Sequence, residues 1–265
     1  MRAPSGLFAF LSLCPIALQA QRTLTDRIHL AGTRTVAFSA RSRPEVCGDG
    51  VRSYSDGLSG NRTRYFDGML GTYEPWDTRI APCEPGAVRV SVRVVDGTPS
   101  WLRVAAGPLP ILGDTVQDLG VVSDAEAGAF LESLVRTGEG RTAVEAIMPV
   151  VLLDSLPRWD ILARAARDST RPSRYRRRAS DLLARAAANT IPAEPNVDGD
   201  TQAARREAVY AYARQRAESD EVVPALLTIA RSNPHRDVRV AALYQLGQTT
   251  DPRAVELFTS MLHGR

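Results

Sequence analysis

The clearest hydrophobic pattern in the chain covers residues 88–94, where four valines alternate strictly with polar side chains. In an extended strand this spacing places the valines on one face and the polar groups on the other. The pattern predicts a strand with one face against a core and one face in solvent. Asp96-Gly97 follows as a hairpin signal, and residues 101–105 supply the returning strand. Pro99 favours a loop longer than two residues between the strands.

The period changes from that of a strand to that of a helix near residue 124. Before it, short alternations at 28–30 and 36–38 predict further strands, and 108–122, with its prolines and glycines, is expected to be a connector. Pro149 is expected to kink or split a helix, and the last four helices are expected to pair as two hairpins. The pattern therefore predicts an α+β chain. The predicted helices cover residues 124–134, 143–151, 157–166, 174–188, 202–216, 220–231, 237–247 and 252–263.

The helical half repeats itself. Segments 170–179 and 232–241 align with proline on proline, arginine on arginine twice and alanine on alanine. Segments 220–227 and 251–258, in the following helix, align at an offset of 31, with aspartate on aspartate and leucine on leucine. A period of about 30 residues with two helices per unit predicts an α-solenoid, in which each unit covers the apolar stripe of its neighbour.

The repeat resembles the HEAT-like repeats of the short, phycobilisome-lyase type. Asp237-Val238-Arg239 and Leu246-Gly247 carry the resemblance. The chain as a whole also resembles exported bacterial proteins of unassigned role that join a small N-terminal β region to such repeats. The resemblance implies a binding or scaffolding solenoid and assigns no activity. Residues 234–262 are then expected to be the closing unit of the array.

The first 20 residues have the features of a secretory signal peptide. Arg2 precedes an apolar run that ends near the small residue Ala20, and the run is too short to span a bilayer. We therefore expect an exported protein of the periplasm, cell envelope or exterior, with no transmembrane segment after the signal peptide. Lipid anchoring at Cys14 is not expected, because Leu13 is bulky where lipidated cysteines follow small residues. The predicted domains are a signal peptide (1–20), a β-rich region (21–115) and a HEAT-like α-solenoid (122–265).

Removal of the signal peptide leaves two cysteines, Cys47 and Cys83. An even pair in an exported chain predicts a disulfide, here at the base of a turn-rich insert that cannot form a core alone. Such a bridge would stabilise the fold by up to about 4 kcal/mol. Two free thiols or half of a metal site are the alternatives.

The net charge of +3 is too small to hold polyanions by charge alone, although all 33 basic residues are arginine. One helix concentrates arginines on a single face, with only Asp181 among them. That face is a candidate for binding an acidic partner or another anion through bidentate contacts, and a solvated helix face is the alternative. Its members are Arg174, Arg177, Arg178 and Arg185.

Other chemistry is weakly represented. The three histidines lie far apart along the chain, and no recognised nucleophile or phosphate-loop motif is present, so we expect no enzyme, cofactor or metal. The segment 196–200 has oxygen-bearing side chains at alternate positions, like a calcium loop, but Thr201 stands where that loop needs glycine. A linker in which Asp200 or Thr201 caps the next helix is the other interpretation.

These features together predict a non-enzymatic protein that binds or scaffolds an unidentified protein partner outside the cytoplasm. Export argues against a nucleic-acid partner. The alternative function is an enzyme or ligand-binding protein with its site between the β region and the helical repeats.

Overall fold

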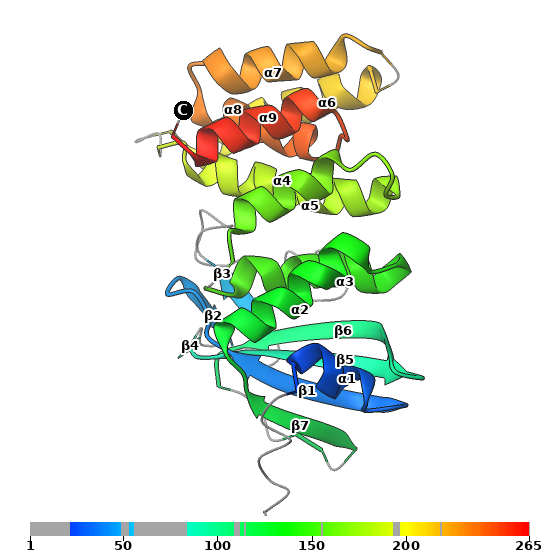
Figure 1. Cartoon of the computed structure of the whole chain (residues 1–265). Coiled ribbons are helices and arrows are strands. Elements are labelled where there is room, and N and C mark those ends of the chain that lie inside the picture. Colours follow the sequence, from blue (N-terminus) through cyan, green and yellow to red (C-terminus); the bar gives the residue numbers. More distant parts are fainter. Residues whose placement is uncertain are drawn as a thin grey trace, which may run out of the picture.

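The computed structural model describes residues 22–48, 53–55, 84–108, 112–113, 115–154, 156–192, 197–217 and 219–264. A β region comes first and helices follow, so the α+β class predicted from the sequence is confirmed. Figure 1 shows the sheet at one end of the molecule and the helices stacked away from it. The first elements along the chain are α1 (Leu24–His29), β1 (Arg34–Ala40), β2 (Val46–Gly48), β3 (Ser53–Ser55), β4 (Glu84–Pro85), β5 (Val88–Val95), β6 (Thr98–Ala106) and β7 (Val116–Val121).

The strands form two sheets. The larger sheet has the order β6-β5-β1-β7, in which β1 pairs antiparallel with β5 and parallel with β7. The smaller sheet has the order β3-β2-β4. All four alternating valines of β5 are buried, so the predicted core face of this strand is confirmed.

The hairpin between β5 and β6 is tighter than predicted. Asp96 and Gly97 form a two-residue turn and both have positive φ, 49° and 76°, which matches the twist of the flanking strands. The expected longer loop was wrong because Pro99 lies inside β6, beside a register shift opposite Val94. Since β6 is an edge strand, a residue without an N–H group is tolerated there.

Two other local predictions in the β region were wrong. Residues 28–30 belong to α1 and its cap, where Thr23 and Asp26 form a reciprocal capping box, and are not a strand. Residues 116–121, predicted as a connector, form the edge strand β7. Most side chains of β7 are exposed, so this strand has no alternating pattern for sequence analysis to detect.

The helices α2 and α3 cover one face of the larger sheet. Phe38 of β1 meets Phe130 of α2 edge to face, with ring centroids 5.9 Å apart. Glu145 of α3, whose side chain is 6% exposed, accepts a 2.8 Å hydrogen bond from the Leu102 amide of β6. Pro149 lies in the last turn of α3, which is continuous and not split. The helices are α2 (Asp124–Thr137), α3 (Gly140–Leu152), α4 (Arg158–Arg167), α5 (Ser173–Asn189), α6 (Gly199–Gln215), α7 (Val222–Ser232), α8 (Arg236–Gly247) and α9 (Pro252–Leu262).

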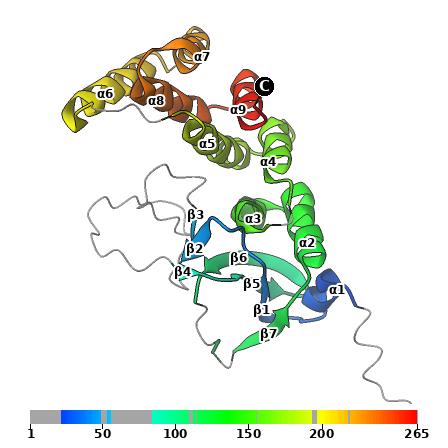
Figure 2. The ribbon, with the colours of Figure 1, turned by 90° about the vertical axis from the view of Figure 1, so that its left-hand side faces the viewer.

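The spatial order of the helices differs from their order along the chain. The α4–α5 pair lies next to α2 and α3; α8 then packs on α5, and α9 packs on both α4 and α5. The main contacts of α6 and α7 are with α8, and α7 lies farthest from the sheet (Figure 1). Figure 2 shows α6 and α9 on opposite sides of α8.

This order corrects two predictions. Residues 234–262 do not simply close the stack, because their first helix, α8, lies between α5 on one side and α6 and α7 on the other (Figure 2). The last four helices do not form the two expected hairpins either, since α7 packs chiefly on α8, and α9 on α5 and α4. The hairpin prediction followed chain order, whereas the packing follows which helix faces fit each other.

A close contact explains why α8 docks on α5. A Cβ atom on Gly247 would lie only 2.7 Å from Cβ of Ala184 and 3.2 Å from Cα of Asp181. The absence of a side chain at Gly247 therefore lets the two helices approach. The next residue, Gln248, then donates a 3.0 Å hydrogen bond from Nε2 to Oδ1 of Asp181.

Candidate functional site

The four arginines predicted as a binding face are divided between solvent and the helix interfaces. Arg174 and Arg177, in the first half of α5, are exposed and form no ion pair with any other described residue. Arg178 is partly buried, with Nη2 4.0 Å from the sulfur of Met148 on α3. Burial lowers the pKa of Arg178 below its usual value. The first half of α5 thus offers two free guanidinium groups beside a third that is held against α3.

Arg185 lies farther along α5 and interacts with side chains of α5 itself, α8 and α6. Its Nε donates a 2.9 Å hydrogen bond to Asp181, which is only 9% exposed, and its guanidinium lies 5.6 Å from the ring centroid of Tyr244 on α8. Burial acts to lower the pKa of Arg185, but the nearby carboxylate of Asp181 acts more strongly to raise it, and Tyr244 and Tyr210 of α6 act in the same direction as Asp181. The pKa of Arg185 is therefore raised above its usual value. We call Arg185, Tyr210 and Tyr244 the arginine–tyrosine cluster.

The arginine–tyrosine cluster has the composition of a protein-binding surface. Arginine and tyrosine are enriched among the residues that carry binding energy at protein interfaces, because each combines apolar area with polar groups. The salt bridge to Asp181 holds Arg185 in one orientation. The sequence identified Arg185 as a candidate but missed Tyr210 and Tyr244, which reach it only because α8 and α6 lie beyond α5 in the stack.

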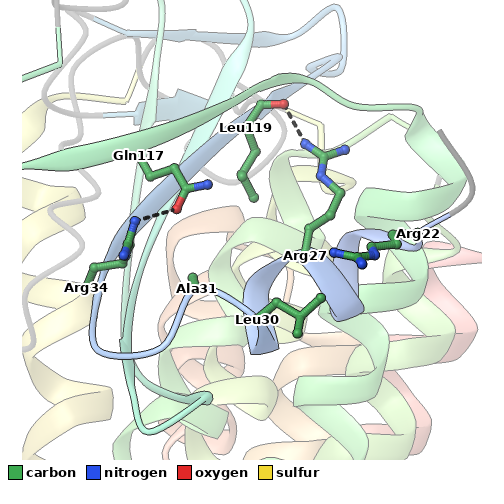
Figure 3. Close-up of a pocket in the computed structure, with 7 residues that line it drawn as sticks. All are labelled: Arg22, Arg27, Leu30, Ala31, Arg34, Gln117 and Leu119. Carbon is green, nitrogen blue, oxygen red and sulfur yellow. Dashed lines mark hydrogen bonds between the residues drawn. The ribbon is translucent and has the colours of Figure 1, made fainter. Parts of the chain in front are cut away.

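A second candidate site lies in the β region. A hollow of about 510 Å³ opens between α1, the start of β1 and β7, on the side of the sheet shown in Figure 3. It is separate from the interface between the sheet and α3, where Glu145 bonds to β6. No pattern in the sequence indicated this hollow. Its lining residues are Arg22, Arg27, Leu30, Ala31, Arg34, Gln117 and Leu119.

The predicted disulfide involves a residue outside the described part of the chain. Cys47 lies in β2, and Cys83 is not described. The pairing of β2 with β4 places Gly48 opposite Glu84, the residue after Cys83 in the sequence. The bridge between Cys47 and Cys83 therefore stays a prediction.

The predicted calcium loop is only partly described, since Asn196 lies outside the described residues. Asp198 accepts a 2.8 Å hydrogen bond from the Thr201 amide and is the N-cap of α6. The capping residue is therefore Asp198 and not Asp200 or Thr201. This cap lowers the pKa of Asp198.

The three histidines are held in separate places. His29 bonds to the Gly97 carbonyl at the β5–β6 turn, His235 precedes α8, and His263 follows α9, 3.6 Å from Asp160. Among the described residues, no group of three or more His, Cys, Asp or Glu side chains is placed to hold a metal ion. In the same part of the chain, no helix has the length and apolar character needed to cross a membrane.

Comparison with known proteins gives one match. Residues 197–264, which contain α6 to α9, match the family model for HEAT repeats. The predicted HEAT-like nature of the chain is therefore confirmed for this segment. No curated protein and no solved structure matches the chain.

Proposed function

We propose that this protein is a non-enzymatic interaction or scaffolding protein of the cell envelope or exterior, and that α5 presents its binding face to an acidic protein segment. HEAT-type helical arrays present extended surfaces to protein partners, and the match over residues 197–264 supports this class of function. The signal-peptide pattern of residues 1–20 supports the location.

The observation that carries the proposal is the coincidence of two features on one face of α5. Arg174, Arg177 and Arg185 lie on the same side of the helix by the helical repeat. The first two are exposed guanidiniums without ion pairs among the described residues, and the third belongs to the arginine–tyrosine cluster. An acidic segment lying along α5 would pair its carboxylates with the free arginines and pack an apolar side chain on the tyrosines.

An enzyme or ligand-binding protein with a site between the β region and the helices is the alternative. Between the β region and the helices, the amide of Leu102 on β6 donates a hydrogen bond to the carboxylate of Glu145 on α3. No observation among the described residues of that interface favours a particular reaction.

The test is affinity capture from envelope extracts with the full chain and two charge-matched double variants. Arg174→Glu with Arg177→Glu reverses the candidate face. Arg136→Glu with Arg231→Glu makes the same charge change at exposed positions on α2 and α7. We expect a stoichiometric partner with the wild type and the control, and its loss with the α5 variant. Equal recovery with both variants, or loss with both, would contradict the proposed face.

A further inference from the structure

The hollow in the β region is lined by three arginines from one short stretch of the chain. Arg22 precedes α1, Arg27 lies within it and Arg34 begins β1, yet all three line one space (Figure 3). None of the three forms an ion pair with another described residue, and no carboxylate lines the hollow. Three like charges around one hollow favour the binding of a negative charge there.

Two of the arginines are held in place by hydrogen bonds that leave most of their donors free. Arg27 donates from Nη2 to the Leu119 carbonyl at 2.6 Å, and Arg34 donates from Nη1 to the side-chain oxygen of Gln117 at 3.2 Å. A guanidinium has five N–H donors, so each keeps several for a ligand. Figure 3 shows both side chains extending toward β7.

Nearby carboxylates have other partners. Asp26 accepts from the amide and hydroxyl of Thr23, and Glu126 accepts from the hydroxyl and amide of Ser123. The pKa of Glu126 is lowered mainly by the Ser123 hydrogen bond, and Arg27 is the smallest contributor. These carboxylates cap helices α1 and α2, so they are held away from the role of counter-ion in the hollow.

Apolar groups accompany the charges. Leu30, Ala31 and Leu119 contribute to the lining, and Leu30 is 64% exposed, so its apolar surface is accessible to a ligand. The volume of about 510 Å³ lies within the range of about 300–1,000 Å³ that is typical of small-molecule sites. The ligand that fits this lining has an anionic head and a short apolar part.

We infer that this hollow binds a small organic anion, with a carboxylate or phosphate ester in the positive field of Arg22, Arg27 and Arg34 and an apolar part on Leu30 and Leu119. The site is independent of the protein partner proposed on α5. Failure of either one therefore leaves the other standing.

Isothermal titration of the full chain with octanoate and with octyl phosphate tests the inference. Octylamine supplies the same apolar part with the opposite charge, and inorganic phosphate supplies an anion without the apolar part. We expect one-to-one binding of at least one of the two octyl anions, tighter by about tenfold or more than binding of either comparison compound. The octyl anion that binds more tightly identifies the head group.

Arg22→Gln is the most informative variant because Arg22 has no partner among the described residues, so its loss leaves the fold intact. We expect this variant and Arg34→Gln each to weaken binding by about tenfold or more, since each removes one of the three positive charges around the hollow. Arg103→Gln, at an exposed position on the opposite edge strand β6, should leave binding unchanged. No binding of either octyl anion at millimolar concentration, equal binding of octylamine, or an equal loss with Arg103→Gln would each overturn the inference.

Discussion

Replacing Gly247 with alanine tests how α8 docks on α5. The new Cβ would lie 2.7 Å from Cβ of Ala184, in a region where Ala184 is fully buried and cannot move aside. Overpacking of this kind costs about 1–3 kcal/mol, and the better helix propensity of alanine returns at most about 1 kcal/mol. We therefore expect Gly247→Ala to lower the free energy of unfolding by up to about 2 kcal/mol.

The most informative quantity is the coupling energy between Gly247→Ala and a second substitution, Ala184→Gly. The second substitution removes the Cβ of Ala184, which is the atom that the new Cβ at position 247 would approach at 2.7 Å. Alone, Ala184→Gly should destabilise the protein by about 2 kcal/mol, through lost helix propensity and a small cavity. In the double variant the clash with Cβ of Ala184 no longer exists. The double variant should therefore be more stable than the sum of the two single effects predicts, by about 1–3 kcal/mol.

Urea unfolding followed by far-UV circular dichroism measures all three variants against the wild type. Gly199→Ala is the matched control, because a Cβ at that exposed position of α6 meets no atom within 4 Å. It should leave stability unchanged or slightly increased. A coupling energy below about 0.5 kcal/mol would be no larger than that between distant sites, and would refute close packing of α8 on α5 at Gly247.

Two further predictions follow from the helical stack. A chain ending at Asn233 lacks α8 and α9, and we expect α6 and α7, with 17 and 11 residues, to lose their structure as well because their main contacts are with α8. Far-UV circular dichroism should show this additional loss, and a loss matching only the deleted helices would contradict the observed order. Asp251 caps α9, and its hydrogen bonds to Arg253 lower its pKa below the usual 3.8. The ionised cap contributes about 1 kcal/mol to the free energy of unfolding. This contribution is fully present above pH 3.8 and is lost as the pH falls through the lower pKa of the folded state. Urea unfolding at about pH 6 and about pH 3 should therefore show a larger loss of stability for the wild type than for Asp251→Asn, which keeps an oxygen that can accept from the cap but does not titrate, and equal losses would contradict this role.

The sequence predicted the elements of this fold better than their arrangement. The strand at Val88 and the helices after Asp124 carry clear periods, because one face of each is buried. The edge strand β7 has no such period, since solvent reaches both of its faces. The order of the helices was also hidden, because the repeated units carry similar small apolar residues, such as Ala179 and Ala241, and several units could cover one another.

The candidate sites depended on information that the sequence does not hold. The helical repeat placed Arg174 and Arg177 on one face of α5, but Tyr210 and Tyr244 reach Arg185 only through the observed order of the stack. The hollow was equally hidden. Arg22 and its two partners are three of 33 basic residues, and only the fold of α1 against β7 separates them from the rest.

The inner position of α8 has a consequence for how the chain is made. A ribosome synthesises α6 and α7 before the helix on which they rest. At about 5–20 residues per second, α6 has no docking surface for a few seconds. The outermost layer of the stack is therefore completed only after α8 has been made and has docked on α5, so growth of the structure does not follow growth of the chain. During that interval the side chains of α7 that are buried in the folded protein, such as Leu226 and Leu227, stay exposed, so the chain is open to chaperones or aggregation at this stage.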